Sequence, residues 1–338
     1  MTHLTYLEAA VVGLVQGVSE MFPVSSLGHN VLIPAIIGGS WATDLNVSKA
    51  ESPYLAFIVG LHVATAIALL IYFRRDWIRI IGGFFTSIRY RRVRTEDQKL
   101  AWMIILATIP VGIVGLLFEH AFRVIFGKPI LAGIFLAVNG VILIAGERYR
   151  SRASKAADAA IADERDPRLI PAREPELVAA GRGPAGSHAR ASARDPRQQE
   201  QAEAIQSDRR LARMSFPQTA LVGSAQILAL LAGISRDGVT MVAGMARGLS
   251  REDAARFAFL LATPVILAAG ALKIPDLLGP LGNGIRGQIL LGSVLSGAAA
   301  YLSVRFLLRY LRTRTLTPFG VYCLIAGVAS VLYLGLVK

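Results

Sequence analysis

Two stretches of this chain match each other: VGLVQGVSEMFPVSSLGH at residues 12–29 and VGSAQILALLAGISRDGV at residues 222–239. At a constant offset of 210 residues, four polar or turn-forming positions are identical. They are Gly13 and Gly223, Gln16 and Gln226, Ser25 and Ser235, and Gly28 and Gly238. An internal match of this kind indicates that the fold is built from two repeats.

Both stretches lie in apolar regions, 5–37 and 217–246, which polar and turn-forming residues interrupt. Irregular backbone is tolerated at membrane depth only where it lines a cavity in the protein. We therefore predict that each region is a broken or re-entrant helical hairpin and not a continuous span.

Six other segments are apolar and long enough to cross a bilayer, which takes roughly 20 helical residues. They are 55–73, 101–118, 130–146, 257–273, 287–308 and 317–336. Of the 338 residues, 54% are apolar and only 17% charged, against about 25% charged in soluble proteins. The predicted fold is an all-α polytopic membrane protein with six transmembrane helices and two re-entrant hairpins. Three spans follow each hairpin, so the first half enters the membrane from one side and the second half enters from the other. The two halves therefore form an inverted repeat.

Composition divides the chain into three parts. Residues 1–146 and 214–338 are the two membrane repeats, and 147–213 is rich in Ala, Arg, Asp, Glu, Gly and Pro. Such a segment cannot bury a core, so we expect a disordered or loosely helical loop without a part in catalysis.

The formal net charge of +13 would suggest nucleic acid if the protein were soluble. With 74–99 placed in the cytoplasm, however, twenty-nine of the 36 Lys and Arg residues lie on that side of the membrane. The charge is therefore mainly an orientation signal. We expect both termini outside and no nucleic-acid partner.

Four ionisable side chains fall within the interrupted regions, although each costs about 2.5–3.5 kcal/mol at the bilayer centre. They are Glu20, His29, Arg236 and Asp237, accompanied by the hydroxyl groups of Ser25, Ser26, Ser235 and Thr240. A guanidinium can bind two phosphate oxygens, and glycine lets backbone N–H groups approach the same anion. This pattern favours anion binding; the alternative is a structural Arg–Glu pair that bridges the repeats.

Glu20 and His29 are separated by a stretch that contains proline and glycine, so their side chains can converge. A carboxylate and an imidazole at one site can act as base, nucleophile or metal ligand. The alternative for His29 is a capping or backbone-bonded residue. We interpret His62, within the first span, as an interior polar group that lines the cavity.

Two stretches of the chain resemble the two signature regions of the undecaprenyl-diphosphatase family. They are QGVSEMFPVSSLGH and GISRDGVTMVAGMARGLSREDAARFAFLLATP. These bacterial membrane phosphatases are linked to bacitracin resistance. Similarity also runs through HVATAIALLIYFRRD and TPFGVYCLIAG, so it covers nearly the whole chain except 147–213. The resemblance implies hydrolysis of undecaprenyl diphosphate to undecaprenyl phosphate and inorganic phosphate, which recycles the lipid carrier for peptidoglycan synthesis and cell-wall biogenesis.

The resemblance also assigns roles to residues. Glu20, Ser26 and His29 take the family's acidic, hydroxyl and imidazole positions, and Arg236 joins them as a catalytic residue. The expected phosphate-binding set is Gln16, Ser25, Ser235, Gly238 and Thr240. Arg251 matches a further family arginine, which the orientation signal explains as well.

This chain departs from the family pattern at several positions. Gln16 stands where the family usually has a glutamate, and Asp237 stands where it has a serine. Ala232 takes the place of a family proline, and Leu27 takes the place of a family threonine. We expect a divalent metal ion, Mg²⁺ or Ca²⁺, held by Glu20 and Asp237, with Asp237 restoring the carboxylate that Gln16 lacks.

The predicted mechanism is metal-assisted phosphoryl transfer in which Ser26 or His29 attacks phosphorus or activates water. The resemblance places the protein in the bacterial plasma membrane, with a site that opens to the outer face. A transporter or lipid flippase without phosphatase activity is the alternative that inverted repeats predict equally well. The glycines would also allow a homodimer.

Overall fold

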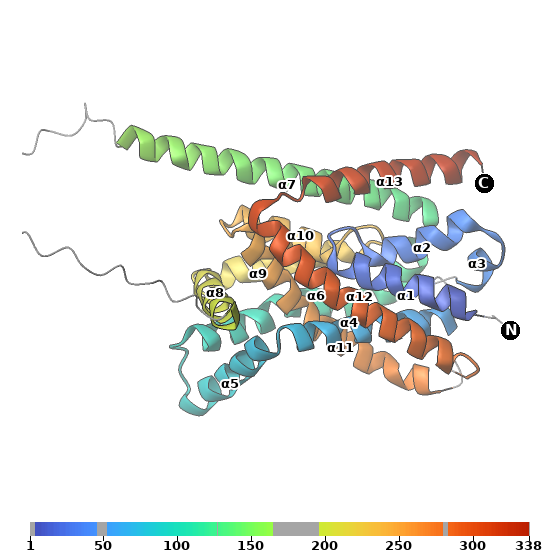
Figure 1. The fold of residues 1–338 in the computed structure, drawn as a ribbon, viewed down its shortest axis with the longest axis horizontal. Coiled ribbons are helices and arrows are strands. Elements are labelled where there is room, and N and C mark those ends of the chain that lie inside the picture. Colours follow the sequence, from blue (N-terminus) through green and yellow to red (C-terminus); the bar gives the residue numbers. More distant parts are fainter. Residues whose placement is uncertain (1–3, 46–52, 127, 165–195, 280–282, 338) are drawn as a thin grey trace, which may run out of the picture.

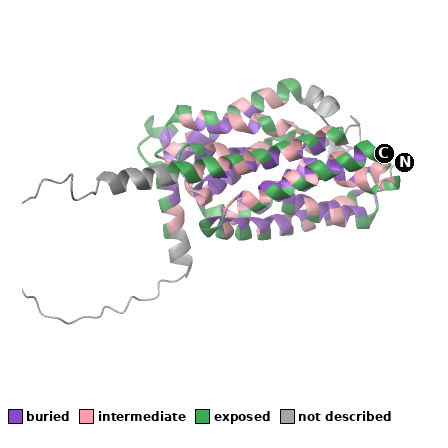
Figure 2. Ribbon diagram, turned by 90° about the horizontal axis from the view of Figure 1, so that it is seen from above, coloured by how far each residue is buried: buried purple, intermediate pink, exposed green. Residues whose placement is uncertain are grey.

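The computed structural model describes residues 4–45, 53–126, 128–164, 196–279 and 283–337, and every regular element in these ranges is a helix. The helices form a bundle with buried side chains in its interior (Figure 2). Figure 1 shows both chain ends at one end of this bundle, and α5 and α8 at the other. The bundle therefore has two distinct ends, as the predicted topology requires.

Each of the six predicted spans lies in one long helix. The helices are α4 (Pro53–Tyr72), α6 (Glu96–Phe126), α7 (Pro129–Glu164), α11 (Arg251–Leu278), α12 (Arg286–Thr313) and α13 (Thr317–Leu336). Five of them are long and apolar enough to cross a membrane alone, and α4 makes a sixth together with its bent continuation. The prediction of an all-α polytopic membrane protein is confirmed.

The two interrupted regions are helical hairpins. The first consists of α1 (Tyr6–Met21) and α2 (Ser26–Ile37), followed by the short α3 (Gly39–Asp44). The second consists of α9 (Phe216–Ser224), the 3-10 helix η1 (Ala225–Leu230) and α10 (Arg236–Ala246). Ser25 caps α2 and Ser235 caps α10, each by accepting a hydrogen bond from a backbone N–H three residues later. Ser25 and Ser235, which match in sequence, are therefore the N-caps of equivalent helices in the two repeats.

The two halves of the chain pack on each other reciprocally. Helix α1 packs along α12, the second span of the other half, and α9 packs along α6, the second span of the first half. The first spans α4 and α11 also pair, as do the third spans α7 and α13. A Cβ atom on Gly13 would lie 2.5 Å from the Gly292 carbonyl oxygen, and one on Gly223 would overlap the Ala107 carbonyl. Gly13 and Gly223, which match in sequence, thus allow α1 to pack closely on α12 and α9 to pack closely on α6.

The segment 74–99, which the charge distribution of the sequence places in the cytoplasm, contains a helix. Helix α5 (Arg74–Tyr90) bends by 85° from α4. Its exposed side chains include Ile78, Ile81, Phe85 and Ile88, which recur at helical spacing. An amphipathic helix of this kind is suited to the membrane surface. A search of the sequence for long apolar segments does not detect such a helix.

The charged segment 147–213 contributes helices to the end of the bundle that carries α5. Helix α7 continues to Glu164, and α8 (Pro196–Leu211) docks through Asp208, which is 1% exposed. Arg256 of α11 contacts Asp208 at 2.8 Å and Asp76 at 3.0 Å, and Arg79 contacts Asp208 at 2.5 Å. Ion pairs therefore join α5, α8 and α11.

Candidate active site

Glu20, near the end of α1, is the centre of a buried polar cluster. Its Oε2 accepts hydrogen bonds from Gln16 Nε2 at 3.0 Å and from the Ser26 hydroxyl, which makes a short contact. His62 of α4 places Nε2 3.3 Å from the same oxygen. The break between α1 and α2 turns the chain back so that Ser26, the first residue of α2, faces the carboxylate.

Arg236, the first residue of α10, reaches this cluster from the second repeat. Its Nη2 donates to Glu20 Oε1 at 2.9 Å, and its Nε donates to Asp237 Oδ1 at 3.3 Å. The structural Arg–Glu pair considered above is therefore present, and it bridges the repeats. Within the described part of the chain, Arg236 Nη1 has no hydrogen-bond partner, and the side chain is 16% exposed. The guanidinium thus keeps a donor for a ligand.

Asp237 is the second carboxylate of the cluster. Its Oδ2 is buried and has no hydrogen-bond partner among the described residues. No three His, Cys, Asp or Glu side chains in the described ranges form a group that could hold a metal ion by themselves. Mg²⁺, however, is commonly bound by one or two carboxylates together with substrate phosphates. The orphaned oxygen of Asp237 fits a ligand of that kind.

His29 has partners different from those of Glu20. Its Nδ1 lies 2.7 Å from the Ser25 carbonyl oxygen, and its Nε2 lies 2.7 Å from the hydroxyl of Tyr322 in α13. The His29 and Tyr322 rings also stack, with centroids 5.8 Å apart. Because a carbonyl can only accept, Nδ1 carries the proton and Nε2 accepts from the Tyr322 hydroxyl in the neutral form. The predicted convergence of His29 with Glu20 through a direct contact is not seen.

The two hairpin breaks meet at Ser25 and Asn139. Ser25 is held at φ 67°, and its hydroxyl oxygen accepts from Gly233 N at 3.2 Å as well as from its own helix. Asn139 of α7 donates to the Pro23 carbonyl at 2.9 Å and accepts from Ser235 N at 3.0 Å. One buried amide thus ties both breaks to the same span.

The remaining predicted phosphate-binding groups take part in local structure. The Gly238 N–H donates to the Ser235 hydroxyl at 3.1 Å, as part of the α10 cap. The Thr240 hydroxyl donates to the Arg236 carbonyl at 2.7 Å. Ser235 and Thr240 both lie in or beside the first turn of α10, whose partly positive N-terminus suits an anion.

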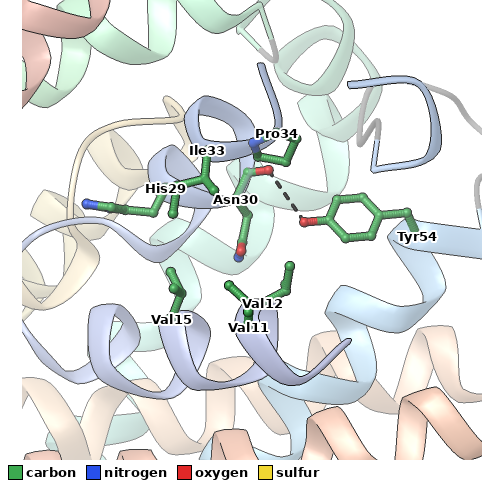
Figure 3. A pocket seen from close by; sticks show the side chains of 8 residues that line it. All are labelled: Val11, Val12, Val15, His29, Asn30, Ile33, Pro34 and Tyr54. Carbon is green, nitrogen blue, oxygen red and sulfur yellow. Dashed lines mark hydrogen bonds between the residues drawn. The ribbon is translucent and has the colours of Figure 1, made fainter. Parts of the chain in front are cut away.

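A narrow cleft runs between the arms of the first hairpin (Figure 3). Its walls are mostly apolar, with His29 and Asn30 on α2 and Tyr54 from α4 at its edges. Asn30 Nδ2 donates to Gln16 Oε1 at 2.6 Å, and Gln16 in turn donates to Glu20. The cleft is thereby linked to the Glu20 cluster through two amide side chains.

Three polar residues of the site do not follow from the sequence reasoning above: Asn30, Asn139 and Tyr322. Asn139 lies in the middle of the predicted span 130–146, where an amide needs partners as an ionisable group does. Asn139 could therefore be identified from the sequence by asking which amide side chains, as well as which charged ones, lie within a predicted span. Tyr322 has no such signal, because tyrosine is common at the ends of spans.

Comparison with known proteins finds a matching family and similar chains. The family model described as bacitracin resistance protein BacA matches residues 9–165 and 189–329. A protein named undecaprenyl-diphosphatase from Mycolicibacterium paratuberculosis is 56% identical over 334 residues, covering 99% of each chain. Undecaprenyl-diphosphatase 2 from Frankia alni is 54% identical over 333 residues, covering 97% of each. A protein of that name from Burkholderia lata is 42% identical over 320 residues, covering 93% of this chain and 92% of its own length.

The family match spans both hairpins and all the residues of the Glu20 cluster. The relatives align over nearly the full length of this chain and of their own. The resemblance predicted from the signature motifs is therefore confirmed, and the chain belongs to the bacitracin resistance protein BacA family.

Proposed function

We propose that this protein hydrolyses undecaprenyl diphosphate to undecaprenyl phosphate and inorganic phosphate. The observation that carries the proposal is that a hydroxyl, a carboxylate and a guanidinium meet at one buried point contributed by both repeats. Ser26 donates to Glu20, and Arg236 binds the other oxygen of that carboxylate. A nucleophile beside its base, with a cation that can receive a phosphate, is the set that phosphoryl transfer requires.

Ser26 is the nucleophile that this geometry favours. Its oxygen attacks the terminal phosphorus, its proton passes to Glu20, and undecaprenyl phosphate leaves with the bridging oxygen. Water then attacks the phosphoserine, and inorganic phosphate is released as the serine regains a proton. Both ring nitrogens of His29 are already engaged by Ser25 and Tyr322, so His29 supports the α2 arm and does not attack.

Arg236 acts on the phosphate. Its unengaged Nη1 can donate to a terminal phosphate oxygen while Nη2 and Nε stay on Glu20 and Asp237. The first turn of α10 adds the positive end of a helix dipole at the same point. These groups neutralise charge in the transition state, where such interactions contribute most of the rate.

A divalent cation also fits the charge of the site. Glu20 and Asp237 provide two carboxylates against one guanidinium, and a diphosphate adds more negative charge. Asp237 Oδ2 and Glu20 would hold Mg²⁺ or Ca²⁺ together with substrate oxygens. When bound, the ion would polarise the phosphoryl group.

We place the opening of the site on the outer face of the plasma membrane. The charge distribution of the sequence supports this orientation, because the Arg-rich segments gather at the end of the bundle opposite the termini. A homodimer stays a prediction, which the mass of the detergent-solubilised protein tests.

The decisive experiment is phosphate release from undecaprenyl diphosphate by the purified protein. Glu20→Ala and Arg236→Ala should abolish release, and a chelator should suppress it if the metal ion takes part. A ³²P label on the terminal phosphate should be trapped on Ser26 and lost in Ser26→Ala; label on His29 would refute the assignment.

The alternative of a transporter or flippase without phosphatase activity is not favoured, because relatives aligned over the whole chain are named as diphosphatases. It makes an opposite prediction for the same sample. Lipid or ion counterflow in proteoliposomes, with no phosphate release, would overturn the proposed hydrolysis.

A further inference from the structure

A second cavity lies at the end of the bundle that carries α8, away from the Glu20 cluster. It has a volume of about 480 Å³ and lies between the part of α7 that carries Arg150, the end of α8 with the α8–α9 connection, and the turn between α10 and α11. Four arginines line it: Arg150, Arg210, Arg213 and Arg247. Helix α10 separates the two sites, with Arg236 at its start and Arg247 just beyond its end, about 16 Å apart along an 11-residue helix. We call this cavity the arginine groove.

Only one of the four arginines is neutralised in the described part of the chain. Arg210 binds Asp253 through two hydrogen bonds, at 2.6 and 2.8 Å. Arg150, Arg213 and Arg247 have no carboxylate partner among the described residues, and Arg213 and Arg247 are exposed. The groove therefore carries three arginines without a direct carboxylate partner among the described residues, of which Arg150 still feels the charge of Glu147.

Nearby carboxylates are engaged elsewhere. Glu147 binds Arg251, and Glu203 and Glu252 both bind Arg312, at 2.7 and 2.9 Å. The segment 165–195 carries six arginines and four acidic residues, so its sequence offers no net negative charge to the groove. Among the described residues, these carboxylates therefore pair with arginines outside the groove.

The shape of the groove suits a small anion with an apolar attachment. Gly248 lines it at φ +89°, and a Cβ atom there would meet nothing within 4 Å, so the groove is open at this point. Its floor contains the buried side chains of Met214 and Leu249. Tyr149, next to Arg150 in the sequence, and Leu221, three residues after Gln218, are more than half exposed, as side chains that face lipid would be.

From these observations we infer that the arginine groove binds a phosphate-bearing anion, and that the head group of an anionic phospholipid is its ligand. Planar guanidinium groups bind phosphate oxygens in pairs, and basic pockets at the ends of transmembrane helices are suited to such head groups. The bound lipid would tie α7, α8 and the α10–α11 turn together. This site is separate from the diphosphate site and does not depend on the proposed hydrolysis.

The test is lipid retention by the full-length protein in detergent, measured by native mass spectrometry with phosphatidylglycerol and phosphatidylcholine. Wild type should prefer phosphatidylglycerol, and Arg213→Gln with Arg247→Gln should lower that preference about tenfold or more, since each surface cation contributes appreciably to binding anionic lipid. Arg92→Gln with Arg94→Gln is the matched control. It removes the same charge from an exposed stretch outside the groove and should change the preference less than twofold.

Two further measurements identify the compound that carries the phosphate and test whether the lipid binds at the Glu20 cluster instead. Inorganic diphosphate that displaces the lipid from wild type would support the groove but assign it to a soluble phosphate compound. Arg236→Gln should keep the lipid preference. Equal losses in the groove and control variants, or no binding of either probe by wild type, would overturn the inference. If the double variant does not fold, Arg247→Gln alone should lower the preference about threefold.

Discussion

Replacing Asn139 by alanine should loosen both hairpin breaks at once. The side chain is fully buried and makes one hydrogen bond to each break, to the Pro23 carbonyl and from the Ser235 N–H. In Asn139→Ala the Ser235 N–H has no substitute partner among the described residues, and the Pro23 carbonyl keeps only the weak contact from the Cys323 thiol at 3.9 Å. The bilayer around the bundle supplies no water. The variant should therefore lose stability and activity together.

The size of the effect follows from the two orphaned groups. A buried donor or acceptor left without its partner costs about 1–3 kcal/mol, so the two together lower the free energy of unfolding by about 2–6 kcal/mol. Ser235 is also the cap of α10, which carries Arg236. Displacement of that cap moves the guanidinium away from Glu20, so kcat should fall more than KM rises.

The assay is unfolding by SDS in mixed micelles, combined with phosphate release at several substrate concentrations. Asn283→Ala is the control, because Asn283 is exposed and among the described residues accepts a hydrogen bond from Arg286 alone; it should change stability by less than about 0.5 kcal/mol. An Asn139→Ala protein within that margin of wild type, with unchanged kcat, would show that Asn139 does not hold the breaks.

Three further substitutions test other parts of the site and fold. Arg236→Lys keeps the charge beside Glu20 but loses the forked donor, so kcat/KM should fall about 100-fold or more; a loss below tenfold would argue against phosphate binding by Nη1 of Arg236. Tyr322→Phe removes only the hydroxyl that donates to His29, so phosphate release should fall by about tenfold or less, and complete inactivation would give Tyr322 a direct catalytic role. Gly223→Val should lower the thermal midpoint in detergent, because overpacking costs about 1–3 kcal/mol; a wild-type midpoint would contradict the close approach of α9 to α6.

The fold is largely readable from the sequence because membrane burial imposes simple requirements. Spans must be long and apolar, and a broken helix such as 5–37 must carry polar residues where its backbone bends. The identity of Ser25 and Ser235 reflects identical capping roles, which is why a single constant offset reveals the repeat. Helix α5 escapes this reasoning because its apolar residues recur at the spacing of an amphipathic helix and do not form the continuous apolar run by which spans are recognised.

The site is readable only in part. Glu20, Ser26 and Arg236 stand out because hydroxyl and charged groups at membrane depth need partners, and the structure brings these three together. The partner of His29 depends on how α13 packs against the first hairpin, and nothing local to Tyr322 indicates that contact. Sequence reasoning finds the groups that need partners, but packing between distant helices decides which partners they obtain.

The reciprocal packing of the two halves has a consequence for how the chain is made. Gly13 of α1 meets Gly292 of α12, about 280 residues later in synthesis, and at 5–20 residues per second the ribosome takes roughly 14–56 seconds to cover that distance. Arg236 follows Glu20 by 216 residues, so for most of that interval the nascent chain holds Glu20 without Arg236 and has half of a catalytic centre. Two fragments divided within 165–195 should be inactive alone and should regain phosphatase activity when co-expressed, because each half carries the surface on which the other completes its fold.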